Sequence, residues 1–141
     1  MRATAVSYDI SQLVLRLTLA IVMWPHGAQK ALGLFGGPGI AGTVAGLGQA
    51  GIPPVVAYLV IALEFLGPIA LVLGILTRLV ALGLAIDMAA AAILVHASNG
   101  FFMNFSGTQK GEGFEYHILA VGIALALVIG GSGRFALLRK T

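Results

Sequence analysis

Five side chains that can donate or accept protons lie where apolar stretches of the sequence end. His26 and Lys30 close the first stretch, His96 closes the third, and Glu115 and His117 open the fourth. Histidine and lysine can donate hydrogen bonds to a ligand carbonyl, and histidine can relay protons near neutral pH. Three histidines and a glutamate are also an acceptable set of zinc ligands, but no two of them have the i,i+4 spacing of a helical metal site. The pattern predicts a polar ligand site without a metal, or else histidines that anchor loops by hydrogen bonds to carbonyl groups.

A second group of ionisable residues lies within the apolar stretches. Glu64 and Asp87 fall near the middle of the second and third stretches, and Arg16 lies in the first. An ionisable group in hydrocarbon costs about 2.5–3.5 kcal/mol, so it persists where it is paired, hydrated or functional. Arg16 between two carboxylates can satisfy both, or one carboxylate can keep its proton. Two interpretations stay open: an ion cluster that sets the helix register, and a proton-handling or ligand-binding site with Glu64 and Asp87 as catalytic groups.

The stretches that must position these residues are predicted to be membrane helices. Of the 141 residues, 59% are hydrophobic and 9% are charged, whereas soluble domains carry about 25% charged residues. About 20 apolar residues cross a bilayer. Four stretches approach or exceed that length and predict an all-α, four-helix membrane bundle forming a single domain over residues 1–141: residues 10–32, 54–76, 79–97 and 114–131.

Basic residues predict how these helices are oriented, because the cytoplasmic ends of membrane helices are enriched in lysine and arginine. Five basic residues fall on one side, Arg2, Arg78, Arg134, Arg139 and Lys140, and two on the other, Lys30 and Lys110. Both termini are therefore expected in the cytoplasm of a bacterium, with residues 33–53 and 98–115 facing outward from its inner membrane. Ile40, Val44 and Leu47 have helical spacing and predict a short interfacial helix in the first outward connection.

The first helix combines a polar stripe with two residues that modify helices. Arg16, His26 and Lys30 fall within one sector when residues are drawn at 100° intervals, so this stripe should face the bundle interior. Pro25 lacks a backbone donor and predicts a kink. Gly27 has no side chain and allows a backbone or a ligand to approach closely.

Small residues recur four apart in the last two stretches, and such rows let membrane helices pack closely. These rows are Ala81, Ala85 and Ala89 in the third stretch, and Gly122, Ala126 and Gly130 in the fourth. The chain contains no cysteine, which excludes dithiol chemistry, cysteine-ligated iron–sulfur clusters and covalently attached haem. No intrinsic cofactor is therefore expected. Because most basic residues lie at chain ends and in turns, no nucleic-acid partner is expected either.

Several longer motifs resemble the DoxX family of small bacterial four-span membrane proteins. They are HGAQKALGLFGGPGIAG after the first stretch, LGQAGIPP before the second, ALEFLGPIALVLGILTRLVAL across the second and third, NGFF in the second outward connection, and GFEYHILAV with GGSGRFAL at the end. His26, Lys30, Glu64, Arg78 and Glu115 match residue types typical of the family pattern. The resemblance implies the four-span fold. It also implies a link to a quinone-reducing thiosulfate oxidoreductase, and to members that resemble partners of a sulfurtransferase and a superoxide dismutase.

Two classes of function follow from the residues and the resemblance together. The first is a membrane oxidoreductase component that binds a quinone or similar lipophilic ligand in the outward leaflet. Its expected pocket is bounded by Trp24, His26 and Lys30, with Glu64 at the floor and His96, Glu115 or His117 at the rim. The second class is a non-enzymatic scaffold or assembly subunit, or a small-solute pathway. Expected partners are the lipid bilayer, soluble redox or sulfur-metabolism proteins, and further copies of the chain.

Overall fold

The computed structural model describes residues 2–138, and every regular element in that range is helical, which confirms the all-α class. The five α-helices are α1 (Arg2–Leu32), α2 (Gly39–Gln49), α3 (Pro54–Leu73), α4 (Thr77–Ala91) and α5 (Glu115–Gly130). Short turns complete the set: the 3₁₀ turns η1 (Leu34–Gly36) and η3 (Ala97–Asn99), and the π-helical turn η2 (Ala92–His96).

Within residues 2–138, three helical segments are long and apolar enough to cross a membrane: Ala5–Leu32, Pro54–Leu73 and Thr77–Asn99. α5 has 16 residues and is about 24 Å long at 1.5 Å per residue. Large aliphatic side chains cover the outside of the helices, with Ile21 70%, Ile86 63% and Ile129 79% exposed. A surface of this kind is suited to lipid and not to water.

The boundaries of α3 and α4 follow from proline and glycine chemistry. α3 starts at Pro54, behind the extended residue Pro53, because a proline in the first turn loses no helical hydrogen bond. It ends at Leu73, since Gly74 takes the left-handed conformation and its N–H caps the carbonyls of the last turn. The predicted end at residue 76 and the predicted start of the next helix at residue 79 are therefore wrong: α4 starts at Thr77.

The helices share one buried core, in which α1 packs against α3 and α5, and α4 packs against α5. Its members are Leu19, Ala20, Met23, Leu71, Ala81, Leu84, Ala85, Met88, Ala120, Ala124 and Leu127. The predicted small row of α4 contributes Ala81 and Ala85. The predicted row of α5 is wrong at Gly122, which is exposed and has no atom within 4 Å of the position of a β-carbon. α5 packs instead through its alanines.

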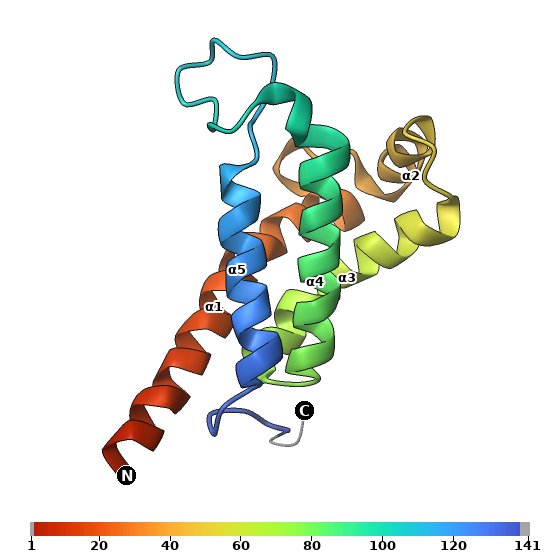
Figure 1. Ribbon diagram of the computed structural model, residues 1–141. Coiled ribbons are helices and arrows are strands. Elements are labelled where there is room, and N and C mark those ends of the chain that lie inside the picture. Colours follow the sequence, from red (N-terminus) through yellow and green to blue (C-terminus); the bar gives the residue numbers. More distant parts are fainter. Residues whose placement is uncertain (1, 139–141) are drawn as a thin grey trace.

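The start of α1 and the end of α5 lie at one end of the bundle, here called the proximal end (Figure 1). The opposite, distal end carries the last turn of α1, α2, and the connection of residues 97–114 between α4 and α5 (Figure 1). Arg139 and Lys140, two of the basic residues used to predict orientation, lie outside the described residues.

Candidate functional site

The site begins where α1 crosses α3 with almost no space between the two backbones. A β-carbon added to Gly27 would lie 2.1 Å from the carbonyl oxygen of Glu64 and 2.5 Å from the backbone nitrogen of Phe65. No side chain fits at such distances, so only glycine permits this crossing. The predicted close approach at Gly27 is confirmed, and the approaching group is backbone. α1 also continues as a helix through Pro25 to Leu32.

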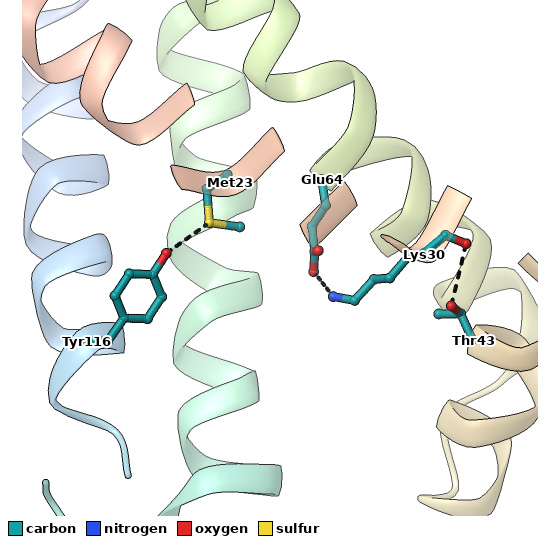
Figure 2. A network of polar contacts seen from close by, with 5 residues as sticks. All are labelled: Met23, Lys30, Thr43, Glu64 and Tyr116. Atoms are coloured by element: carbon teal, nitrogen blue, oxygen red, sulfur yellow. Dashed lines mark hydrogen bonds and ion pairs between the residues drawn. The ribbon is translucent and has the colours of Figure 1, made fainter. Parts of the chain in front are cut away.

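The crossing brings a lysine of α1 to a glutamate of α3. Lys30 Nζ donates a hydrogen bond to Glu64 Oε1 and forms an ion pair with it. The Glu64 side chain is 1% exposed, whereas that of Lys30 is 30% exposed. Thr43 of α2 donates to the backbone carbonyl of Lys30 at 3.5 Å. Figure 2 shows the ammonium group directed at the carboxylate, with Thr43 on the far side of Lys30.

A cavity of about 280 Å³ opens beside this ion pair. Its walls combine ionisable side chains with a few apolar ones from α1, α3, α4, η2, α5 and the distal connection: His26, Lys30, Glu64, Met88, Ala91, His96, Met103, Glu112, Tyr116 and His117. All three histidines of the protein therefore meet in one cavity at the distal end. The structure brings together the predicted ligand-binding residues of three different stretches.

The π-helical turn explains how His96 reaches the cavity. A π-turn holds more residues per turn and changes the direction of the side chains that follow it, and η2 spans Ala92–His96. The ring of His96 lies 4.3 Å from that of His117, centroid to centroid. His96 Nδ1 donates to the carbonyl of Glu112 at 2.8 Å, so His96 anchors the distal connection as well as lining the cavity.

Asp87 lies behind the cavity wall and not in it. Its carboxyl group lies close enough to that of Glu64 for the two to interact electrostatically. One oxygen of each group, Asp87 Oδ2 and Glu64 Oε2, is buried without a further partner among the hydrogen bonds of the described residues. His117 Nδ1 is buried and unpartnered in the same way. A buried polar atom without a partner is costly, so these three atoms are candidates to bind a proton or a ligand.

Arg16 does not pair with either carboxylate, so this part of the prediction is wrong. Its guanidinium group is fully buried near the proximal end, where it donates to the carbonyls of Leu71 and Val72 at 2.7 and 2.8 Å. It also donates to Ser132 and Phe135 at 2.6 and 2.8 Å. The last carbonyls of α3 have no partner within the helix, and Arg16 satisfies them while holding the segment after α5.

Trp24 and Glu115 were predicted to border the pocket and do not line it. Each lies two residues from a histidine that does, and two residues correspond to about 200° around a helix. Trp24 packs against Phe65, with ring centroids 6.2 Å apart, and lines a separate apolar groove between α1 and α3. The Glu115 carboxylate accepts a hydrogen bond from the backbone N–H of Met103 at 2.7 Å and so fixes the distal connection.

Five cavity residues were missed by the sequence analysis: Met88, Ala91, Met103, Glu112 and Tyr116. Tyr116 was detectable, because it stands beside His117 at the start of a helix. Its hydroxyl group donates to Met23 Sδ at 3.9 Å (Figure 2). Glu112 carried no periodic signal, since it belongs to an irregular connection. Among residues 2–138, no group of three or more His, Asp or Glu side chains is arranged to hold a metal ion.

A family model described as DoxX matches residues 11–97, more than half of the chain. The chain belongs to the DoxX family. The match confirms the resemblance drawn from the sequence motifs. Lys30 and Glu64 lie within the matched residues, and His117 lies beyond them. A relative from Bacillus subtilis (strain 168), named "Putative oxidoreductase CatD", is 31% identical over 121 residues, which cover 86% of this chain and 81% of the relative. No solved structure matches the chain.

Proposed function

We propose that this protein is a subunit of a membrane oxidoreductase system and binds a quinone-like lipophilic ligand in the distal cavity. The observation that carries the proposal is the Lys30–Glu64 ion pair in a cavity that also holds three histidines and a tyrosine. Ionisable groups at membrane depth mark ligand and proton sites by default. The name of the Bacillus subtilis relative supports the redox class.

The ligand chemistry follows from the donors that remain in the cavity. Lys30 uses one N–H for Glu64 and keeps two for a ligand, because an ammonium group has three donors. His26 lines the same cavity and can donate from a ring nitrogen. A quinone head group has two carbonyl acceptors on an apolar ring. Met88, Ala91 and Met103 supply apolar wall for that ring.

The membrane arrangement belongs to the same proposal. The four helices α1, α3, α4 and α5 span the inner membrane of a bacterium as a multi-pass bundle, with both termini in the cytoplasm. α2 then lies at the outward interface, and the distal cavity opens in the outward leaflet. Electrons then pass through a soluble redox or sulfur-metabolism partner, which docks on one copy or on an oligomer.

Quinone binding to purified protein tests this function. Quinone is measured by solvent extraction of the purified protein and by titration with a short-chain quinone, for the parent, His26→Ala and Lys30→Met. A hydrogen bond to a charged group contributes about 1.5–3 kcal/mol, so Lys30→Met should weaken binding about ten- to a hundredfold. Lys110→Met is the matched control, because Lys110 is exposed on the distal connection and does not line the cavity.

Two results would reject the oxidoreductase proposal. One is a parent protein that neither carries nor binds quinone. The other is parent-like binding by both cavity variants. Either result favours the scaffold or solute-pathway class.

A further inference from the structure

Within residues 2–138, the buried carboxyl group of Glu64 and the partly buried one of Asp87 lie beside one cation, Lys30. Lys30 of α1 pairs with Glu64 of α3, and Asp87 of α4 contacts Glu64 from behind the cavity wall. Arg16 is committed to four carbonyl groups near the proximal end. The charge of Glu64 also acts on His26 of α1 and Tyr116 of α5. Neither is a permanent cation, so two ionised carboxylates beside Lys30 would leave a net negative charge in the apolar interior.

One added proton would neutralise the net charge of this group and give the unpartnered carboxyl oxygens a hydrogen bond. Glu64 Oε1 accepts from Lys30, which leaves Glu64 Oε2 buried and without a partner. Asp87 Oδ2 is also buried without a partner. An ionised carboxylate can only accept hydrogen bonds, so two carboxylates cannot satisfy each other. A proton placed between them turns one oxygen into a donor and neutralises the Lys30–Glu64–Asp87 group.

We infer that Asp87 and Glu64 share one proton, so that Lys30, Glu64 and Asp87 form a neutral hydrogen-bonded chain that ends at the ligand cavity. Asp87 is then a positioning residue that acts through Glu64 and not a group that touches the ligand. The consequence for catalysis rests on the proposed function: a dissociable proton sits directly behind the wall against which a quinone-like head group would bind.

Infrared spectroscopy of the ligand-free protein at neutral pH tests the inference, because protonated and ionised carboxyl groups absorb separately. The parent should show one buried protonated carboxyl group. Asp87→Asn should remove this signal, because an asparagine amide has no titratable proton. The protein should stay folded, because the amide still donates a hydrogen bond to Glu64. Glu64→Gln should also remove it, because Asp87 then ionises as the counter-ion of Lys30. Lys30→Met should strengthen it, since both carboxyl groups then need protons.

Asp9→Asn is the control. Asp9 accepts from the backbone N–H of Arg134 at 2.9 Å in the proximal part of the molecule, so this variant should leave the signal unchanged. A parent without a protonated carboxyl signal overturns the inference, and so does a signal that persists in both Asp87→Asn and Glu64→Gln.

The outcome separates this inference from the proposed function, because the signal is recorded without ligand. A parent that shows the signal but binds no quinone rejects the proposed function and supports the shared proton. A parent that binds quinone but lacks the signal rejects the shared proton alone. Bound quinone should shift the signal, and a signal that does not move overturns the link between this proton and the ligand site.

Discussion

The substitution Lys30→Met removes the cation of the α1–α3 ion pair and so measures how much this pair contributes to stability. In Lys30→Met the Glu64 carboxylate loses its cation while it remains 1% exposed. Breaking a buried ion pair from one side costs about 3–5 kcal/mol. Because the Lys30 side chain is 30% exposed, part of the pair is already hydrated, and the lower end, about 3 kcal/mol, is the expected loss. At about 4 °C per kcal/mol, the melting temperature in detergent should fall by about 12 °C.

Substituting Lys30 and substituting Glu64 should not lower the stability by the same amount. Glu64→Gln leaves Lys30 with Asp87 as its counter-ion and with access to water, so we expect a loss of only about 1 kcal/mol, as for an exposed pair. The double variant Lys30→Met/Glu64→Leu removes both charges together. It should melt closer to the parent than Lys30→Met does, because a buried pair replaced by apolar groups is often neutral or stabilising.

The assay is thermal unfolding of these variants and of Glu64→Leu in one detergent, with Lys30→Met, Glu64→Leu and their double variant analysed as a double-mutant cycle. Interaction of the two side chains predicts a non-additive cycle. The reasoning is refuted if Lys30→Met melts within about 2 °C of the parent, or if the losses of the single substitutions add up in the double variant.

Three further outcomes are expected. Arg16→Met should lower stability by at least about 3 kcal/mol, since it removes four hydrogen bonds to backbone carbonyls, two of them buried; a parent-like melting temperature would contradict this role. Gly27→Ala should cost about 1–3 kcal/mol by forcing two backbones apart. Its control is Gly122→Ala, in open space on α5, which should be neutral or stabilising. Equal effects of the two substitutions on the melting temperature would disprove the crossing argument. Reporter fusions after Gly107 and at Thr141 should report opposite sides of the membrane, and reports from the same side would rule out the four-span arrangement.

Features that depend on neighbouring residues could be predicted from the sequence. The low charge content and the long apolar stretches indicated membrane helices, because a chain with 9% charged residues cannot cover a water-facing surface. The i,i+4 spacing of His26 and Lys30 placed both on one face of α1, and both line the cavity. The missing side chain of Gly27 predicted a close approach. Each inference uses composition or helix periodicity, which are local properties of the chain.

The choice of partners was decided by tertiary structure. In the sequence, Arg16 between Glu64 and Asp87 could satisfy both carboxylates, or one carboxylate could keep its proton, and the choice stayed open. The backbone contact at Gly27 places Glu64 within reach of Lys30, 34 residues away, while Arg16 lies at the carbonyls that end α3. A cation binds whichever acceptor the helix crossing brings to it, and the position of a crossing is not encoded in helical periodicity.

The convergence of the histidines likewise required the folded chain. His96 belongs to the π-turn η2, and a π-turn changes the direction of side chains at the end of a helix. Glu112 and Met103 reach the cavity from an irregular connection that is held by hydrogen bonds to backbone groups of its own residues. The sequence by itself determined that polar residues would gather at one end of a membrane bundle. Which of them share a cavity depended on a helix crossing, a π-turn and a loop conformation, and these are set by packing between segments far apart in the chain.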